Sequence, residues 1–332
     1  MNNYYLIIQG NTFVKQNYKL KHSYKMKLKY LLILAAFINL IACKETEAKL
    51  NQSKLEVEVF KGKEASVNRY VFNNGKSIVI MDALRSSENA SELAKFVENK
   101  KLPLTHILVT HGHPDHYIGM DILAQKFPEA KIVVAGKEIK DDIIGFSNWM
   151  ESVGWLEGEP NLKPKSDKNP NGFDYEGKIQ VLETNQLTLK GGGTLELEIN
   201  YSAAEAEHLT SVYSKDLEAL FTSDFCYNGV HLWLGQGVDQ KNIDGWKNEL
   251  NKLKAAYSNT NVTIYPGHGE KSTIDLIDIN LKYISDFENT IKTSSSKEEA
   301  MDKMKKLYPN WEQAEFLLLN SVNYHMNLKE NK

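Results

Sequence analysis

The sequence predicts an α/β protein, in an α+β arrangement, on the basis of three observations. Short runs of valine, isoleucine and leucine are typical of strands, and longer runs with apolar residues three or four positions apart are typical of helices. The two kinds of segment alternate along the chain, and glycine-rich or asparagine–glycine turns separate them. The 332 residues are 42% apolar and 25% charged, which suits a globular protein with a sizeable core.

The first half of this pattern begins after about residue 53. An Asn-Gly pair at 74–75 is a strong hairpin signal between two of its strands. A helix over 87–100 places Leu93, Phe96 and Val97 on one side. Strands are expected over 55–60, 67–72, 78–82, 107–110 and 132–134. Further helices are expected over 117–127 and 138–153.

The second half contains more strands and ends in helices. Residues 158–177 are rich in Pro, Asn, Lys and Gly, so we expect a surface loop that adds nothing to the core. Strands are expected within 178–201 and over 210–213, 219–222 and 262–265, with helices over 241–257 and in most of 272–332. No internal repeat or long linker interrupts this pattern, so we expect one domain over 54–294 and a helical C-terminal extension over 295–332.

The N-terminal residues differ from the rest. Residues 26–29 are short and basic, and residues 30–42 are apolar except for Asn39, a run too short to span a membrane comfortably but suited to a signal peptide. Leu40–Cys43 resembles the lipobox of bacterial lipoproteins, in which the leader is cleaved before a cysteine that is then acylated. We therefore expect residues 1–43 to be an N-terminal extension and signal peptide, and residues 44–53 to be a tether. We expect translation to start at Met26, and the alternative is an unusually long basic n-region.

This resemblance implies a lipoprotein of a bacterial cell envelope, periplasmic or surface-exposed, held at the membrane by a lipidated Cys43. The alternative is an amphipathic or core helix with a chance cysteine. The other cysteine is Cys226, which we expect to be a small buried thiol, so acylation of Cys43 would exclude an intramolecular disulfide. The formal net charge of −3 provides no basic surface of the kind that nucleic-acid-binding proteins carry.

Three histidines and an aspartate lie within six residues, directly after the strand expected over 107–110. These residues are His111, His113, Asp115 and His116. A strand end followed by a tight loop with Gly and Pro can turn alternate side chains toward one point, so His111 and His113 can share one metal ion. Asp115 and His116 can then face a second ion. Imidazole and carboxylate are ligands that zinc accepts at about 2.0–2.2 Å. The loop cannot complete the ligand shells of two ions, so further ligands must come from elsewhere.

The pattern His-x-His-x-Asp-His after a strand resembles the signature of the metallo-β-lactamase superfamily, and residues 55–290 follow the order of that family. The resemblance implies a four-layer αβ/βα sandwich with a helical C-terminal portion and both metals at one edge between the sheets. It also implies that Asp224 bridges the two metals and that His268, in a Gly-His-Gly turn, is the last ligand. Asp82 matches a strand-end aspartate that supports the metal loop.

The middle histidine of the family pattern is the irregular part of this sequence. The family has a Gly-His-Thr segment well before the bridging aspartate, whereas here residues 203–208 read Ala-Ala-Glu-Ala-Glu-His. We predict that His208 is the ligand, from a shortened loop. The alternative is that Ala204 or Glu205 occupies the usual position, with Glu205 as a carboxylate ligand. If neither His208 nor Glu205 binds, the site would hold one metal.

A second cluster over 226–233 includes Tyr-Asn-Gly-Val-His and resembles a stretch in a less-characterised branch of the superfamily. The resemblance implies that Tyr227 or His231 lines the pocket and donates a hydrogen bond to the substrate or its oxyanion. The alternative is a core strand with a satisfied histidine. We expect the remaining histidines, His22, His106 and His325, to be structural or solvated.

These expectations describe a hydrolase that binds two zinc ions per chain, with other divalent metals as alternatives. The metal ligands expected are His111, His113, Asp115, His116, His208, Asp224 and His268, and the catalytic residues expected are Asp115, Tyr227 and His231. A metal lowers the pKa of bound water from 15.7 toward about 7, so hydroxide becomes available to attack a carbonyl or phosphoryl centre. No Gly-x-Ser-x-Gly elbow suggests a protein nucleophile.

The expected substrate is a small molecule with a lactone, ester or similar carbonyl group. The presence of both Asp115 and Asp224 resembles the thioesterase and lactonase branches, and an exported protein would meet few cytosolic thioesters. The alternatives are a β-lactam or thioester hydrolase of the same fold and a non-catalytic metal-binding envelope lipoprotein.

Overall fold

The computed structural model describes residues 54–62 and 66–331. The signal peptide, Cys43 and the tether expected from the sequence lie outside the described residues. Ser53–Lys332 forms one compact unit. Among the residues that the structure describes, no helix has the length and apolar character needed to cross a membrane.

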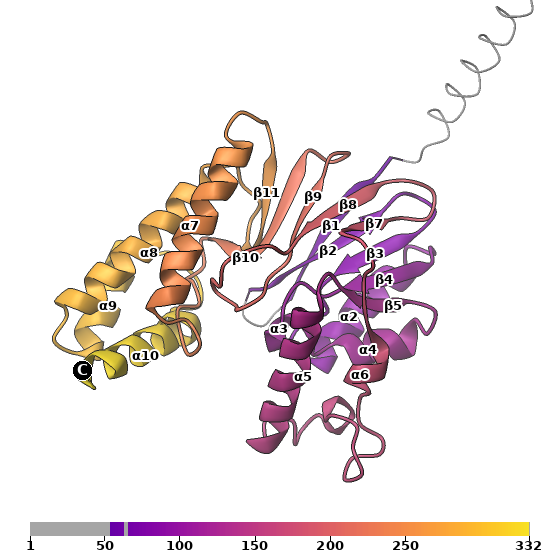
Figure 1. Cartoon of the computed structure of the whole chain (residues 1–332), viewed down its shortest axis with the longest axis horizontal. Coiled ribbons are helices and arrows are strands. Elements are labelled where there is room, and N and C mark those ends of the chain that lie inside the picture. The colour runs from indigo at the N-terminus through magenta and orange to yellow at the C-terminus, as the bar shows by residue number, and fades with distance from the viewer. Residues whose placement is uncertain (1–53, 63–65, 332) are drawn as a thin grey trace, which may run out of the picture. The chain divides into compact units, whose positions relative to one another are not determined.

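Two sheets form the centre of this unit (Figure 1). The first sheet has the order β1-β2-β3-β4-β5-β6, antiparallel from β1 to β3 and parallel from β3 to β6. Its strands are β1 (Glu56–Lys61), β2 (Asn68–Asn73), β3 (Ile78–Met81), β4 (Leu104–Leu108), β5 (Lys131–Val134) and β6 (Ile179–Val181). The second sheet has the order β11-β10-β9-β8-β7, in which only the β10–β11 pair is parallel. Its strands are β7 (Gln186–Thr188), β8 (Thr194–Glu198), β9 (Ser211–Ser214), β10 (Ala219–Asn228) and β11 (Thr263–Gly269).

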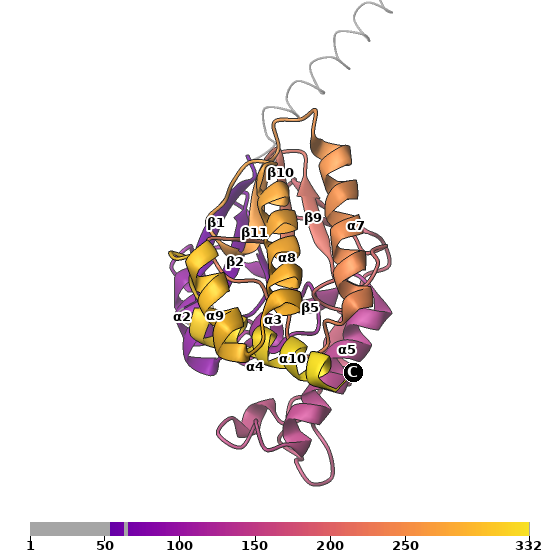
Figure 2. The ribbon, with the colours of Figure 1, turned by 90° about the vertical axis from the view of Figure 1, so that its left-hand side faces the viewer.

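Helices cover the outer face of each sheet. In the first half they are α2 (Ser87–Glu98), α3 (Pro114–Tyr117), α4 (Met120–Lys126), α5 (Lys137–Ser152), the 3₁₀ helix η1 (Pro160–Leu162) and α6 (Tyr175–Lys178). In the second half they are α7 (Gln240–Tyr257), α8 (Leu276–Thr293), α9 (Lys297–Leu307), the π-helix η2 (Ala314–Leu318) and α10 (Leu319–Glu330). Figure 2 shows α7 and α8 side by side across the second sheet, where α8 contacts β10.

Three apolar clusters fill the spaces between the four layers. The cluster between the sheets joins them through edge-to-face contacts such as Phe72 with Phe221, whose ring centroids are 4.8 Å apart. A second cluster lies between the first sheet and its helices, and a third lies between the second sheet and α7 to α10. This arrangement confirms the predicted αβ/βα sandwich with a helical C-terminal portion. Because Ala300 and Val322 are fully buried in the third cluster, residues 295–332 share a core with the second sheet.

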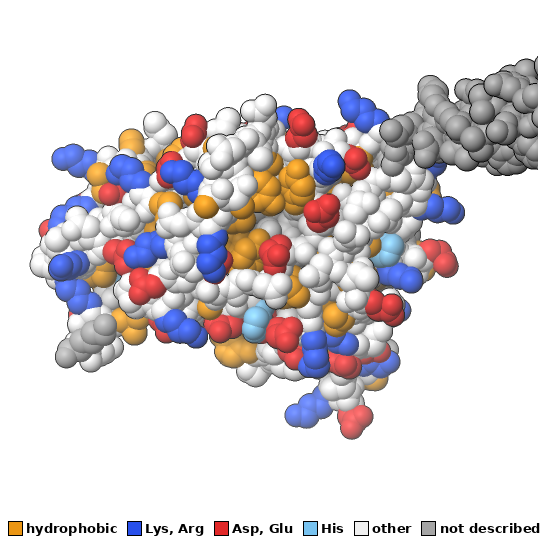
Figure 3. All heavy atoms as spheres, turned by 45° about the horizontal axis from the view of Figure 1, so that its top comes forward, with side chains coloured by type: hydrophobic (Ala, Val, Ile, Leu, Met, Phe, Trp, Pro, Cys, Tyr) orange, Lys and Arg blue, Asp and Glu red, His pale blue; other side chains and the backbone are white. Residues whose placement is uncertain are grey.

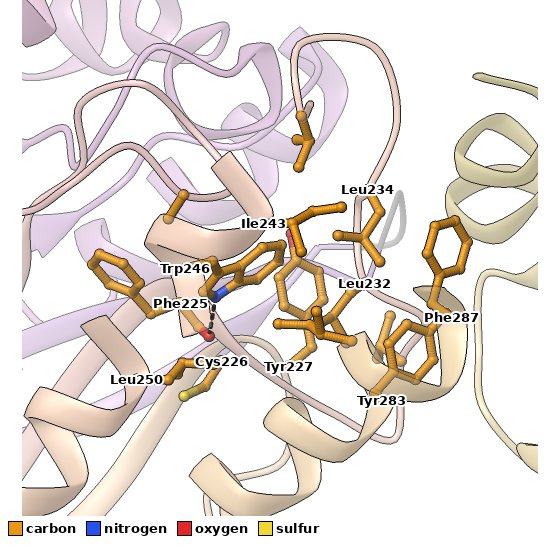
Figure 4. Packing of buried hydrophobic residues seen from close by; sticks show 14 of the residues in the cluster. Phe225, Cys226, Tyr227, Leu232, Leu234, Ile243, Trp246, Leu250, Tyr283 and Phe287 are labelled. Carbon is orange, nitrogen blue, oxygen red and sulfur yellow. Dashed lines mark hydrogen bonds between the residues drawn. The ribbon is translucent and has the colours of Figure 1, made fainter. Parts of the chain in front are cut away.

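Cys226 lies in the third cluster and is one of the residues labelled in Figure 4. Trp246 Nε1 donates a hydrogen bond to the Phe225 carbonyl at 2.9 Å there, which joins α7 to β10. Burial raises the pKa of the Cys226 thiol to about 12. The prediction of a small buried thiol is therefore confirmed, and the neutral thiol is a poor nucleophile or metal ligand.

The helix expected over 117–127 is interrupted, and this interruption shapes the metal site. Tyr117 ends α3 and the rest of the expected helix begins only at α4, because the amide of Gly119 donates to the Leu84 carbonyl at 3.0 Å instead of continuing the helix. A Cβ on Gly119 would lie 2.0 Å from the Ala83 carbonyl oxygen, so only glycine permits this close approach. The short helix α3 is thereby held against the loop that follows β3.

The prediction for residues 158–177 was wrong in one respect. The segment contains η1 and the start of α6, and it contributes Leu162, Phe173 and Tyr175 to the core beneath α5. These apolar residues are separated by polar ones without a helical or strand period, so the sequence carried no periodic signal for their burial.

Candidate metal centre

The metal loop is supported by Asp82, which follows β3. Strands β3 and β4 are parallel neighbours, so their carboxyl ends lie at the same edge of the sheet. Asp82 Oδ1 accepts a hydrogen bond from the Thr110 amide at 2.8 Å, and Oδ2 lies 2.9 Å from His116 Nδ1. This bond presents His116 Nε2 to the site, the usual arrangement beneath a metal-ligating histidine. Asp82 has φ +69°, a left-handed conformation that the surrounding contacts must hold.

Arg69 of β2 is a supporting residue that the sequence argument missed. Its guanidinium is fully buried and donates to the backbone carbonyls of Asp115 and Asn68. Burial lowers the pKa of Arg69, whereas the nearby carboxylates of Asp82 and Asp115 act in the opposite direction. A single charged residue within a strand that is otherwise uncharged and buried along most of its length is the signal that could have identified it, because a buried charge requires partners.

The second sheet brings two further side chains to the same place. Asp224 lies on β10, and His268 lies on β11, its parallel neighbour, whose register against β10 shifts in this region. A Cβ on Gly267 would lie 1.9 Å from Asp224 Oδ1, so glycine is required for β11 to pass the carboxylate. Asp224 Oδ2 lies 3.2 Å from His268 Nε2 and 3.4 Å from His116 Nε2.

Two groups of side chains, joined by Asp224, are arranged as metal ligands. In each group the ligand atoms lie within 4.8 Å of one another. The first group is His111, His113 and Glu205, and the second is Asp115, His116 and His268. Asp224 forms a further group with His111 and His116, so it lies between the other two.

The residues fit divalent cations. His111 Nε2, Glu205 Oε2 and Asp224 Oδ1 are buried without a hydrogen-bond partner among the described residues, whereas buried polar atoms are nearly always satisfied. All three residues belong to the ligand groups. Imidazole nitrogen and carboxylate oxygen are the donors that zinc and similar divalent ions accept, so cations between the groups would satisfy these atoms.

The electrostatics of the site also favour cations. Burial lowers the pKa of His113, but the charge of Glu205 and their 2.8 Å contact outweigh it and raise that pKa to about 9. Burial alone would raise the pKa of Asp224, yet His116 and His268 together lower it well below its usual range. The buried carboxylates therefore require positive charge, which protonated imidazoles or bound metal ions can supply.

The structure places Glu205, and not His208, beside the other ligands. His208 Nδ1 lies 2.8 Å from Asp142 Oδ2 on α5, its side chain is 41% exposed, and it belongs to none of the three groups. Glu205 is 3% exposed, with Oε1 2.8 Å from His113 Nδ1. The geometry thus disagrees with the prediction that His208 is the middle ligand and favours the alternative. The two residues are close in sequence, and only the path of the turn decides which of them faces inward.

Tyr227 and His231, both expected to face the substrate, lie in different places. The Tyr227 hydroxyl donates to Asp224 Oδ2 at 2.8 Å, and its ring stacks on His268 with centroids 4.4 Å apart. Tyr227 therefore supports two ligand residues, and its hydroxyl is committed to Asp224. His231 Nδ1 lies 2.8 Å from the Tyr283 hydroxyl in the helical core, away from the ligand groups. This placement matches the alternative of a core histidine.

A family model described as the metallo-beta-lactamase superfamily matches residues 62–268, which is more than half of the chain. The chain belongs to the metallo-beta-lactamase superfamily. Membership supports the prediction of a metal-dependent hydrolase.

Two proteins and one solved structure show how far the similarity of sequence extends. The probable metallo-hydrolase M6_Spy0554 of Streptococcus pyogenes serotype M6 is 24% identical over 220 residues, which cover 63% of this chain and 82% of that protein. The uncharacterized protein YobT of Bacillus subtilis (strain 168) is 33% identical over 72 residues, which cover 22% of this chain and only 30% of YobT. A metallo-beta-lactamase from Pontibacter korlensis is 17% identical, with a TM-score of 0.48, over 70% of this chain and 95% of that structure.

Proposed function

We propose that the protein is a zinc-dependent hydrolase that acts on a small carbonyl substrate, such as a lactone or an ester. The observation that supports this proposal is the pair of ligand groups joined by Asp224, in which buried nitrogen and oxygen atoms have no hydrogen-bond partner among the described residues. His111, His113 and Glu205 would hold one ion, and Asp115, His116 and His268 the other. Bound there, the ions would supply Lewis acidity and make hydroxide available near neutral pH.

The protein's own residues orient this centre and handle protons. Asp82 fixes the ring of His116, and Tyr227 fixes the carboxylate of Asp224. Asp115 is 17% exposed, so its carboxylate can accept a proton from the attacking water at the open side of the site and pass it to the leaving group. In this proposal Asp115 has a catalytic function, while Tyr227 is a positioning residue.

Surface charge bears on the class of substrate. On the face drawn in Figure 3, acidic and basic side chains are interspersed without a field of one sign, so this face offers no basic surface for a polyanion. The alternatives are a β-lactam or thioester hydrolase and a metal-binding protein without turnover. Membrane attachment through a lipidated Cys43, in a bacterial cell envelope, is a separate proposal that rests on the sequence.

The test combines metal analysis with a substrate screen. The purified protein is dialysed against a chelator and then reloaded with zinc, manganese or iron, and bound metal per chain is measured by mass spectrometry. Lactones, esters, thioesters, nitrocefin and phosphodiesters are assayed at each stage. We expect two ions per chain, loss of hydrolysis without metal and recovery with zinc. Activity that survives complete metal removal contradicts the mechanism, and two bound metals with no turnover favour the binding protein.

Attachment to the membrane is tested with a Cys43→Ser variant. We expect this variant to leave the membrane fraction while its metal content stays unchanged. Continued tight membrane binding would point to an uncleaved apolar anchor over 30–42 instead.

A further inference from the structure

The open side of the metal centre lies next to His113. The side chains of His111, His116, Glu205, Asp224 and His268 are at most 2% exposed. His113 is 23% exposed and Asp115 17%. A substrate therefore reaches the centre past His113 and Asp115, and any group attached to its reacting carbon must extend from there.

Helix α5 is packed directly against the metal loop at this opening. A Cβ on Gly112 would lie 2.7 Å from Asp142 Cβ, so the helix and the loop touch between His111 and His113. The buried face of α5 carries Ile143 and Met150. Phe146, Trp149 and Val153 follow Asp142 at spacings of four, seven and eleven residues, so they continue from the metal loop along one face of the helix.

These residues form an aromatic ledge, which we define as Phe146, Trp149, Val153 and Trp155. The ring centroid of Phe146 lies 6.3 Å from that of His113 and 5.2 Å from that of Trp149. The centroids of Trp149 and Trp155 are 5.0 Å apart. Trp149 is 40% exposed, Val153 48% and Trp155 59%. A continuous line of rings thus runs from a candidate metal ligand out to solvent.

We propose that the aromatic ledge binds an apolar substituent, a medium-length alkyl chain or an aryl group, on the carbonyl substrate of the metal centre. This inference rests on the proposed function. The support for this proposal is that the ledge is continuous with the metal centre. It starts at His113, the most exposed candidate ligand, and three of its side chains are exposed. Trp and Phe rings provide large apolar contact areas with little conformational freedom to lose on binding.

A lipid surface is the competing occupant, and the acidic residues of the segment that carries the ledge argue against it. Glu151, Glu157 and Glu159 lie within the same segment, and residues 141–162 contain no lysine or arginine. An anionic bilayer surface attracts basic segments and repels acidic ones. An uncharged substituent meets no such repulsion.

The experiment uses the zinc-loaded full chain and a series of γ-lactones whose alkyl substituent grows by one methylene at a time. We expect kcat/KM to rise about twofold per methylene, since an open ledge covers one side of the chain and gains part of the full burial effect. A Trp149→Ala/Trp155→Ala variant is expected to flatten this rise while its rate on unsubstituted γ-butyrolactone stays within about twofold. Conservative replacement of both tryptophans by phenylalanine should preserve most of the rise. Leu307→Ala, which removes a 51% exposed apolar side chain on α9, is the matched control.

A measurement without turnover separates this inference from the proposed function. Saturation-transfer NMR on the metal-free protein is expected to show contact with the alkyl protons of γ-decalactone, and this contact should fall in the double alanine variant. If no lactone is hydrolysed but the NMR contact remains, the proposed hydrolysis is contradicted and the binding of apolar groups at the ledge is still supported. An equal chain-length dependence in wild type and double variant, or equal NMR contact, overturns the ledge. Loss of binding to phosphatidylcholine vesicles in the double variant, with an unchanged chain-length dependence, would also overturn it in favour of a lipid contact.

Discussion

The metal centre and a second cluster in the helical core both bury histidine, but they surround it with opposite chemistry. The second cluster, which we name the aromatic box, consists of His231, Tyr283, Tyr308 and Trp311. In the metal centre the imidazoles face carboxylates. In the aromatic box His231 contacts the Tyr283 hydroxyl and is surrounded by aromatic rings. The ring of Tyr283 stacks on that of Trp311, with 5.0 Å between the centroids.

The pKa values of the histidines in the two clusters reflect this contrast. Glu205 raises the pKa of His113 to about 9, whereas burial lowers the pKa of His231 to about 4. Tyr227 and His231 are four residues apart, yet Tyr227 supports Asp224 and His231 joins the box. A histidine in a segment that resembles a family motif is therefore a candidate metal ligand only when carboxylates or other ligand side chains lie close to it in the fold.

The largest effect is expected from a variant that removes the carboxylate of Asp224, which joins the two ligand groups. An Asp224→Asn variant deletes a carboxylate near both His116 and His268, so we expect metal affinity to fall by more than about 100-fold, beyond the loss typical of supporting residues. Metal content after gel filtration is the measurement, with the exposed Asp216→Asn as the control. Retention of two ions per chain would show that Asp224 does not bridge them.

A second variant pair separates the two candidates for the middle ligand. Glu205→Ala should empty the first group, and the ions bound per chain should fall from two to one. His208→Ala should leave metal content unchanged, because His208 pairs with Asp142 at the exterior. The reverse result would restore His208 as the ligand, and calorimetric zinc titration of both variants gives the answer.

A smaller effect is expected from Asp82, which touches no candidate metal position directly. Asp82→Asn weakens the acceptor for His116 Nδ1, so the second group should lose about 10- to 100-fold in metal affinity. Asparagine tolerates the left-handed backbone at this position, so the fold should persist. Stepwise metal release during chelator titration is the readout, and unchanged affinity in the second group would argue against an orienting function.

The smallest effect concerns the aromatic box and tests its neutral histidine. The pKa of His231 in the folded protein, about 4, lies below the usual 6.5 of the unfolded chain, so folding excludes a proton. The stabilising contribution is complete above about pH 6.5 and is lost as the pH falls toward 4. At pH 5 we expect wild type to lose about 1 kcal/mol more than a His231→Asn variant, allowing for solvent screening.

Urea unfolding at pH 7.5 and pH 5 measures this difference. Both proteins carry His325, so its lowered pKa affects them alike and cancels in the comparison. An identical pH dependence in the two proteins would mean that His231 is protonated without cost in the folded state.

Much of the fold and the metal loop could be predicted because their signals are local. Alternating strand and helix periods predicted the α/β class, and the family resemblance implied the four layers. His111 to His116 occupy one short loop after a strand, so their proximity follows from the chain itself. Asp224 and His268 could be assigned only through the family resemblance. Arg69 was missed because a single charged residue in a strand does not indicate which groups it will contact. The buried side chains of 158–177 were missed because they follow no helical or strand period.

The sequence by itself determined the donor types of this protein, imidazole and carboxylate, and the order in which strands present them. Tertiary structure decided which donors meet. Glu205 instead of His208 faces the centre, and Tyr227 instead of His231 reaches it, because the path of the folded backbone directs one side chain to the site and the other to the exterior or the core. Such choices depend on contacts between distant segments, such as Gly267 against Asp224 and α5 against Gly112, which no local pattern in the chain records.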